Sequence, residues 1–396
     1  MRTTTRVRTG AILTDEMLAR FDERAARYDR DNRFFEEDFE ELRESGYLLA
    51  AVPEELGGAG LTLAGLMPLQ QRLAYHAPAT AVAVNMHLYW TGVAADLWRA
   101  GDDSCRWILE EAARGAVFAA GHGEVGNDAG LFAATTAAEP VPGGWLVTGH
   151  KIFGSLSPVW TYLGVHAMDT SDPEHPRVIH GFVPRDAAGY RIEQTWDALG
   201  MRATASHDTV MERVFLPDHL VPVVSPAGAG GAGPFQLGVI AWALIGFAHV
   251  YAGVAWRAYD LTVEAAKRRT SIGLTRTLAH HPGVQHEVAE MRIALEAVEA
   301  TLVKIREEWS AGAPHGAMWP LKIVAAKYFA VNQAWKVVDA AIDVSGGGGV
   351  FRRNRLEQLF RDARLGRIHP ANTFATHEIV GKLALGVDLD EQPRWG

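Results

Sequence analysis

The stretch Ala340–Arg364, AAIDVSGGGGVFRRNRLEQLFRDAR, joins an apolar helical run to a charged helix through four consecutive glycines. Each glycine costs roughly 1 kcal/mol relative to alanine in a helix interior, so helix packing does not favour Gly346–Gly349 here. Glycine is needed where a backbone turns sharply or approaches another group closely. Because backbone N–H groups in such turns bind anions, and Arg352, Arg353 and Arg355 follow, the stretch favours an anion site over an ordinary helix corner.

Composition limits the kinds of protein that this chain can be. Its 396 residues are enough for two or three domains, or for one large helical assembly with an insert. Hydrophobic residues make up 48% and charged residues 21%, as in folded globular proteins. The formal net charge of −9 argues against a nucleic-acid groove or a polybasic membrane anchor, so neither nucleic acid nor membrane is expected as a partner.

Cysteine usage and the N-terminus indicate the compartment. Cys105 is the only cysteine, which excludes an internal disulfide and a cysteine-rich metal site, and no metal is expected. The first residues, MRTTTRVRTGAILTDEM, are basic but lack an apolar core of signal-peptide length. No run approaches the ~18 apolar residues that span a bilayer. We therefore expect a cytoplasmic protein.

The periodicity of apolar residues changes twice along the chain. Asp15–Arg114 has helical spacing, interrupted by the Pro- and Gly-rich turn Val52–Leu61, and predicts long helices at Leu63–Ala77 and Thr80–Ala100. Short β-rich runs follow, separated by Pro, Gly and Asp turns. These predicted strands are Val117–Ala120, Trp145–Thr148, Tyr162–His166, Arg177–Val183 and Thr209–Phe215.

The remainder of the chain is predicted to be helical. Pro226–Pro234, PAGAGGAGP, is typical of a flexible joint. After it come an apolar helix, a helix with a buried seam from Val284 to Ile305, and a third long helix, Met318–Ser345. The prediction is a mostly α, α+β fold. Its parts are an N-terminal helical domain (residues 1–115), a middle antiparallel β domain (116–225) and a C-terminal four-helix bundle (226–396).

Five motifs occur in an order that resembles the acyl-CoA dehydrogenase superfamily over nearly the whole chain. They are VPEELGGAGL (52–61), GWLVTGHKIFGS (144–155), LGMRATAS (199–206) with FLPD (215–218), RRTSIG (268–273), and SGGGGVFRRNRLEQLFRDAR (345–364). The resemblance implies a flavoprotein oxidoreductase that binds FAD and takes a small-molecule substrate. A CoA or carrier-protein thioester and an electron-transfer partner would accompany this function.

The resemblance also implies the cofactor-binding residues. Phe153 and Ser155 would lie beside the isoalloxazine ring, and Arg269 and Ser271 would reach the FAD pyrophosphate of a neighbouring subunit. An arginine fork suits a diphosphate. Sharing of FAD between subunits implies a homo-oligomer, expected to be a tetramer. The other implied cofactor-binding residues are Gly346, Gly347 and Gly348 at the adenosine side, and Asn372.

Two departures from the family pattern concern the reaction. A family dehydrogenase removes the α-proton of an acyl thioester with a glutamate after the RDA helix, but Pro370 stands at that position. Some members carry the glutamate on the first bundle helix, where Ala243 stands here. The flavin-side loop Gly121–Asp128 lacks the usual proline and serine, and Asp343 replaces a glutamine.

Three other side chains are candidates for the missing base. His369 adjoins the vacant position, His122 lies in the flavin-side loop, and Glu378 lies farther along. Imidazole has a suitable pKa near 6.5. Structural roles are the alternative for each residue: His369 as a loop cap, His122 as a hydrogen-bonding group, and Glu378 as a solvated carboxylate.

Three functions are consistent with these residues. The first is an FAD dehydrogenase that desaturates an acyl thioester or a related substrate with a displaced base, which the motif order favours. The second, ranked close behind, is a two-component flavin monooxygenase that uses FAD or FMN, a flavin reductase partner and O₂ to hydroxylate an amine or aromatic ring. The missing glutamate favours it, because oxygen transfer needs no α-proton base. The third is a flavin-binding protein without turnover.

Overall fold

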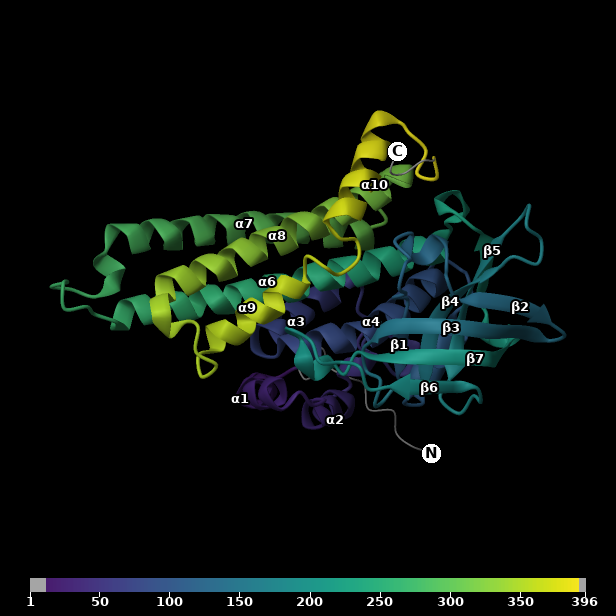
Figure 1. Ribbon diagram of the computed structural model, residues 1–396, viewed down its shortest axis with the longest axis horizontal. Coiled ribbons are helices and arrows are strands. Elements are labelled where there is room, and N and C mark those ends of the chain that lie inside the picture. The colour runs from purple at the N-terminus through teal and green to yellow at the C-terminus, as the bar shows by residue number, and fades with distance from the viewer. Residues whose placement is uncertain (1–11, 392–396) are drawn as a thin grey trace.

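The computed structural model describes residues 12–391, and the remaining residues, among them the stretch 1–11 in which no signal peptide is expected, lie outside the described part. A long helical body carries a β-sheet at one end, and a short helix, α10, projects from the body (Figure 1). Helical segments precede and follow the sheet along the chain, which confirms the predicted mostly α, α+β fold.

The N-terminal helices agree closely with the predicted ones. The predicted helices Leu63–Ala77 and Thr80–Ala100 correspond to α3 and α4. Helix α4 begins two residues earlier than expected because Pro78, with its fixed φ and no N–H to satisfy, suits a first helical turn. The five helices are α1 (Asp15–Asp31), α2 (Glu36–Glu44), α3 (Leu63–His76), α4 (Pro78–Arg99) and α5 (Arg106–Ala113).

The sheet has eight strands in the order β6-β7-β3-β2-β4-β5-β8, with β1 paired to β4. All five predicted strands are present, and β2, β6 and β8 were missed. The strands are β1 (Phe118–Gly121), β2 (Ala137–Val141), β3 (Gly144–Gly154), β4 (Tyr162–Asp169), β5 (Arg177–Pro184), β6 (Tyr190–Glu193), β7 (His207–Pro217) and β8 (Val223–Pro226).

The expectation of a purely antiparallel sheet is wrong for two pairs of strands. Both β1 and β2 run parallel to β4, one after the other along the same edge of that strand. The chain leaves β1, forms the β2–β3 hairpin, and returns so that Thr161 and Tyr162 both donate to the Val117 carbonyl, at 2.7 and 3.1 Å. As a result β4 runs in the same direction as β1, and the sheet contains both parallel and antiparallel pairs of strands.

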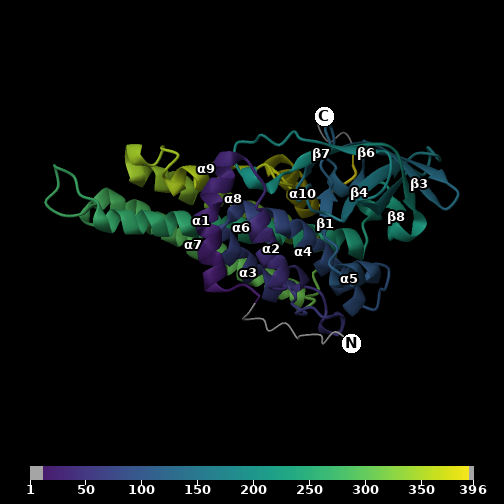
Figure 2. The ribbon, with the colours of Figure 1, turned by 90° about the horizontal axis from the view of Figure 1, so that it is seen from below.

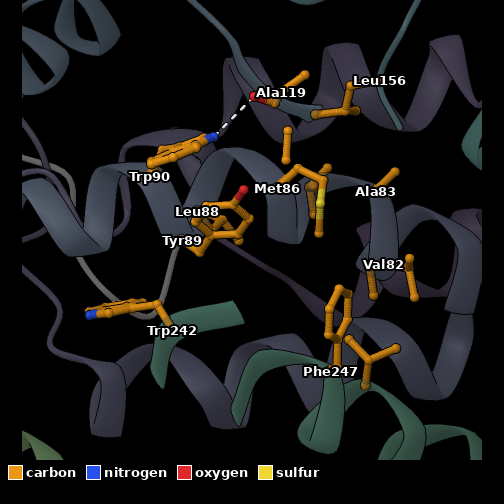
Figure 3. Packing of buried hydrophobic residues seen from close by; sticks show 14 of the residues in the cluster. Val82, Ala83, Met86, Leu88, Tyr89, Trp90, Ala119, Leu156, Trp242 and Phe247 are labelled. Atoms are coloured by element: carbon orange, nitrogen blue, oxygen red, sulfur yellow. Dashed lines mark hydrogen bonds between the residues drawn. The ribbon is translucent and has the colours of Figure 1, made fainter. Parts of the chain in front are cut away.

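Helix α4 is buried almost all round because it lies between α3, α6 and the sheet. The indole N–H of Trp90 donates to the carbonyl of Ala119 in β1 at 3.0 Å (Figure 3). Gly164 allows this approach, since a Cβ there would lie 2.4 Å from the Trp90 ring. Truncation of such a buried tryptophan costs about 3–5 kcal/mol. The sheet is therefore fixed firmly to the helical body.

The C-terminal helices form the long bundle. Met291, Leu295, Val298, Leu302 and Ile305 are buried along α7, which confirms most of the predicted seam. Helix α6 is apolar and long enough to cross a membrane, but 89% of its most apolar window is buried inside the protein, as in a core helix. The helices are α6 (Pro234–Arg268), α7 (Pro282–Ser310), α8 (Trp319–Ser345), α9 (Arg355–Leu365) and α10 (Thr373–Leu385).

Two contacts tie distant parts of the chain together. The predicted joint Pro226–Pro234 is not a free linker, because the Asp390 carboxylate accepts from the backbone N–H groups of Ala229 and Gly230 at 2.8 and 2.9 Å. Figure 2 shows α1 lying near α9, where Arg361 donates to both carboxylate oxygens of Asp29 at 2.9 and 2.6 Å. The bidentate geometry gives this pair both strength and direction.

Candidate active site

The inner end of β3 presents an aromatic ring to solvent. Phe153 is 56% exposed, has a φ of 61°, and meets Trp196 edge to face at 6.1 Å between ring centroids. Ile152 forms an isolated β-bridge with Gly123. A Cβ added at Gly123 would lie 2.7 Å from the Ile152 carbonyl oxygen and 3.1 Å from the Phe153 ring. A non-glycine residue at positive φ signals a strained backbone. The exposed ring is therefore held in place for contact with a flat group.

Three buried hydroxyl groups lie behind Phe153. Ser155 Oγ is 2.7 Å from Ser206 Oγ, which is 2.6 Å from Thr204 Oγ1. Thr204 in turn donates to the carbonyl oxygen of Met201 at 2.9 Å. A connected set of hydroxyl groups inside a protein is satisfied and rigid. The set therefore holds the predicted cofactor residue Ser155 in one orientation.

His122 lies at the start of the loop that follows β1. Its Nδ1 is 3.5 Å from the Tyr89 hydroxyl, and its ring lies 5.4 Å from both Trp90 and His166. The ring nitrogen Nε2 is buried and has no hydrogen-bond partner. Burial, together with neighbouring His180 and Lys151, lowers the pKa of His122. The imidazole is therefore neutral near pH 7 and a weaker base than an ordinary histidine, which disfavours the predicted role as the missing base.

Glu124 and Lys151 form a buried ion pair beneath this loop. The Lys151 ammonium donates to Glu124 at 2.6 Å and to the His166 carbonyl at 2.6 Å. Burial raises the pKa of Glu124. The charge of Lys151 and the hydrogen bonds from Lys151, Thr136 and the Thr135 N–H outweigh burial and lower this pKa to about 2. Both groups are ionised at neutral pH. Glu124 is therefore a structural anion and not a free base.

The bundle side of the site is formed by the turn between α9 and α10. His369 packs against Phe247 at 4.5 Å and Tyr251 at 5.6 Å between ring centroids, and its buried Nδ1 has no hydrogen-bond partner. Burial and the nearby Lys327 lower its pKa. Pro370 follows and is exposed. This turn brings no carboxylate to the position where a family dehydrogenase carries one.

Lys327 fixes the same turn from inside the bundle. Its side chain is 1% exposed, and the ammonium donates to the carbonyl oxygens of Gly366, His369 and Ala371 at 3.0, 2.7 and 3.0 Å. These carbonyls follow the C-terminal end of α9, where the helix dipole favours a cation. Burial lowers the pKa of Lys327 to about 7. One buried cation therefore positions the whole α9–α10 connection.

Asn372 and Glu378 belong to α10. Asn372 caps this helix, because its side-chain oxygen accepts from the Ala375 N–H at 3.0 Å. Glu378 forms an ion pair with Lys382 at 3.0 Å, one helical turn away. The prediction that Asn372 contacts a cofactor stays untested, as does a catalytic role for Glu378.

The remaining predicted cofactor residues gather at the far end of the bundle. Arg269 donates to the Ser345 carbonyl at 2.7 Å, directly before Gly346–Gly348, and Ser271 is exposed in the following loop. A Cβ at any of these three glycines would meet nothing within 4 Å. Packing within the chain therefore does not require Gly347 and Gly348, whereas the φ of 60° at Gly346 favours glycine by itself. Contact of these glycines with a cofactor stays a prediction.

The two groups of residues lie far apart in one chain. Helix α6 carries Phe247, beside His369, and ends at Arg268, beside the glycine turn, and a rise of 1.5 Å per residue gives roughly 30 Å between these two residues. The α9–α10 turn and the glycine turn of one chain therefore lie far apart along α6. The residues present fit a flavin: an exposed aromatic face, a fixed hydroxyl group, and a bare anion-binding turn with an arginine.

Several residues of the site were not predicted from the sequence. Lys327 has a visible signal, since it is a lone lysine in the apolar run IVAAKYFAV. Lys151 and Glu124 lie on different segments, and only the structure brings them together. Thr204 and Ser206 lie within a motif that was noticed, LGMRATAS, but their contact with Ser155 crosses from one strand to another.

Comparison with known proteins agrees with this geometry. Three family models match in chain order: the acyl-CoA dehydrogenase N-terminal domain over residues 13–115, the middle domain over 118–214 and the C-terminal domain over 237–370. The fold and the site define a flavin-dependent oxidoreductase. The chain belongs to the acyl-CoA dehydrogenase family.

Its relatives catalyse different reactions. The putative acyl-CoA dehydrogenase YdbM of Bacillus subtilis is 30% identical over 88% of this chain and 90% of its own. The L-evernosamine nitrososynthase of a Micromonospora strain is 28% identical over 97% and 91%. A solved structure of KijD3 in complex with FMN and dTDP-3-amino-2,3,6-trideoxy-4-keto-3-methyl-D-glucose is 28% identical, with a TM-score of 0.83 over 97% of this chain and 95% of that one.

Proposed function

We propose that the protein is a flavin-dependent monooxygenase that receives reduced flavin from a reductase partner and oxidises an amino group of a small molecule. The observation that carries this proposal is the lack of a base at both positions where family dehydrogenases hold a glutamate. Pro370 and Ala243 stand there instead. Desaturation of a thioester requires removal of an α-proton, whereas oxygen transfer to a nitrogen lone pair does not.

The carboxylates closest in sequence to the site are engaged in other contacts. Glu124 is bonded to a buried lysine, Glu378 is paired with the lysine one turn later, and Asp362 accepts from the backbone N–H of Met201 at 2.5 Å. A carboxylate held in an ion pair is a poor substitute for a free base. Asp362 differs, because burial raises its pKa to about 7 and its Oδ2 has no hydrogen-bond partner, but it lies on α9 behind Met201 and not in the α9–α10 turn. This supports a reaction in which a carboxylate base is not needed.

The residues on the sheet side and on the bundle side of the site have different roles in the proposed reaction. Phe153 offers a ring face to the flavin, and Ser155 offers a fixed hydroxyl oxygen. His122 and His369 are neutral imidazoles whose pKa burial lowers to about 3, so they can offer hydrogen-bonding nitrogens to the substrate but are weak proton acceptors at neutral pH. Lys327 keeps the α9–α10 turn in place. A reduced flavin bound there supplies the electrons and activates O₂, while the protein orients the amine and excludes water.

The cofactor and the assembly follow from the same proposal. We take FMN as the working flavin, as in the KijD3 complex. FAD, which Arg269 and Gly346–Gly348 favour, would need these residues from a second copy because they lie far along α6 from the α9–α10 turn. We propose a cytoplasmic homotetramer in which neighbouring copies complete each site.

A coupled assay tests the function directly. The protein is incubated with an NADH-dependent flavin reductase, FMN, ¹⁸O₂ and a panel of dTDP-amino sugars, and matched sugars with a hydroxyl in place of the amine serve as controls. We expect incorporation of ¹⁸O only into the amino sugars. Labelling of neither set, with NADH consumed at the rate of the reductase alone, would contradict amine oxidation.

The second candidate is desaturation of an acyl thioester, which the 30% identity to YdbM favours. An acyl-CoA assay of the parent protein beside a Pro370→Glu variant separates the two candidates. If the position faces the substrate, the added carboxylate should create acyl-CoA oxidation that the parent protein lacks. Acyl-CoA oxidation by the parent protein itself would favour the second candidate over the first.

A further inference from the structure

The hydroxyl groups of Ser155, Ser206 and Thr204 form a row that runs from the end of β3 into the protein. Their residues are 6%, 4% and 1% exposed, so the groups rely on one another for hydrogen bonds. The oxygens are separated by 2.7 and 2.6 Å, and Thr204 reaches the carbonyl oxygen of Met201 at 2.9 Å. We refer to Ser155, Ser206, Thr204 and the Met201 carbonyl as the hydroxyl row.

Counting protons gives the row a direction. Each hydroxyl group has one proton to donate, and a carbonyl oxygen can only accept. Thr204 donates to Met201, so it must accept from Ser206. Ser206 has then used its proton and must accept from Ser155. Ser155 has also used its proton, which leaves its oxygen able only to accept a hydrogen bond from any further group.

The opposite direction is less stable by one hydrogen bond. If Ser155 donated outward, Ser206 would donate to Ser155 and Thr204 to Ser206, and the bond from Thr204 to Met201 would be lost. One net hydrogen bond favours the inward direction by roughly two- to tenfold. Met201 is itself fixed, because its N–H donates to the buried carboxylate of Asp362 at 2.5 Å. The far end of the row is therefore anchored to α9.

We propose that the hydroxyl row makes Ser155 a hydrogen-bond acceptor toward the bound flavin and so selects the reduced flavin over the oxidised one. This inference rests on the proposed function, in which the flavin ring lies against Phe153 and Ser155. Oxidised flavin presents a lone pair at N5, whereas two-electron reduction places an N–H there. An acceptor oxygen complements the N–H and opposes the lone pair.

The selection matches the proposed route of the electrons. A protein that takes up reduced flavin from a reductase gains from binding that form tightly, because the oxidised form is released after the reaction. A preference of about tenfold for the reduced flavin corresponds to a midpoint potential about 30 mV higher for a two-electron couple. The row therefore sets the redox preference of the site from residues that reach the flavin only through Ser155.

The test is a set of substitutions with two readouts that do not depend on turnover. The first readout is the ratio of the Kd values for oxidised and reduced FMN, measured anaerobically, and the second is the midpoint potential of the bound flavin. A Thr204→Val variant removes the anchor, so Ser206 can donate to Ser155 and Ser155 can donate outward. We expect the ratio to fall by up to tenfold and the potential by up to about 30 mV.

Matched variants show whether the effect belongs to the row. Thr204→Ser keeps the hydroxyl group and should retain the parent ratio. Ser155→Ala removes the contact and should lower the ratio. Ser157→Ala is the control, because Ser157 is a buried serine of the same segment that donates to the Ala205 carbonyl at 2.7 Å, outside the row. It should leave the ratio unchanged.

The possible failures are distinguishable. Thr204→Val and Ser155→Ala proteins that bind FMN with the parent ratio would overturn the inference and leave the proposed function standing. A parent protein that binds neither redox form of FMN or FAD would overturn the proposed function itself. Equal loss of both affinities in Thr204→Val, with no change in the ratio, would show that Thr204 is only a structural residue and would contradict the inference.

Discussion

The two walls of the site each contain a buried lysine, and the two lysines are stabilised in different ways. On the sheet side, Lys151 is paired with Glu124 at 2.6 Å. On the bundle side, Lys327 contacts three backbone carbonyl oxygens, and no ion pair with a carboxylate is found for it in residues 12–391. The sheet-side lysine is balanced by a carboxylate, whereas the bundle-side lysine has neutral carbonyl partners.

The difference between the lysines shows which wall can change its charge. Burial lowers the pKa of Lys151 to about 8 despite Glu124, and lowers that of Lys327 to about 7. Opposite charge holds an ammonium in its ionised form, while carbonyl dipoles oppose burial less strongly. Lys327 should therefore lose its proton at a lower pH than Lys151, so the bundle side of the site responds first as the pH rises.

The largest expected effect comes from breaking the buried ion pair between Glu124 and Lys151. A Glu124→Gln substitution keeps the shape of the side chain but leaves the Lys151 ammonium buried without its counter-ion. Loss of one partner of a buried pair costs about 3–5 kcal/mol. We expect a fall of this size in the free energy of unfolding, measured by urea denaturation. The double variant with Lys151→Met should recover a large part of it, and a single-variant loss below about 1 kcal/mol would contradict the assignment.

The second effect is the pH dependence caused by Lys327. Its pKa is lowered in the folded state, so the unfolded chain binds more protons between about pH 7 and the ordinary lysine pKa of 10.5. Stability should therefore rise with pH in this window. Relative to Lys327→Met, the parent protein should gain on the order of 2 kcal/mol between pH 7 and 9. Parallel curves for the two proteins would show that the ammonium is not titrating there.

The third effect is local opening of the α9–α10 turn. In Lys327→Met the three carbonyl oxygens lose their shared donor, while the apolar packing of α8 is kept. We expect trypsin to cleave after Arg367, within the turn, about tenfold faster than in the parent, which is about 1.4 kcal/mol of local stability. The Glu124→Gln/Lys151→Met double variant, in which the sheet-side pair is replaced as a whole, should not change cleavage at this site. Equal acceleration in both variants would indicate global destabilisation instead.

The smallest effect separates the two walls as surfaces for the flavin. Phe153→Ala on the sheet wall should weaken FMN binding by roughly threefold to tenfold, as expected for loss of one aromatic contact. Phe374, 71% exposed on α10, is the control aromatic residue on the bundle side. Fluorescence titration of Phe374→Ala should give the parent Kd. A larger loss for Phe374→Ala than for Phe153→Ala would place the ring on the opposite wall.

Much of the fold could be predicted from the sequence because its elements are long and periodic. The seam of α7 and the run from Leu63 to Ala100 show their helical period plainly. The strands β2, β6 and β8 were missed because they are short, and β2 and β8 contain prolines. The parallel pairing of β1 with β4 depends on how the chain returns after a hairpin, which no local pattern records.

The candidate site was predictable only where a residue type has a local cause. The glycine turn at Gly346–Gly348 is visible because four glycines interrupt a helix, and Pro370 is visible as a change from a motif. The pair of Glu124 with Lys151 and the contact between Ser155 and Ser206 join segments that are 27 and 51 positions apart. Such contacts depend on strand register, and only the folded structure specifies them.

An anaerobic spectral titration tests most directly whether the missing carboxylate has removed desaturation. The purified, flavin-loaded protein is mixed with a panel of acyl-CoA thioesters of short to long chain in the absence of O₂, and absorbance of the oxidised flavin is followed. We expect the flavin spectrum to keep its full intensity with every thioester. Bleaching of the flavin by any of them would show that the site contains a working base and would contradict the proposed function.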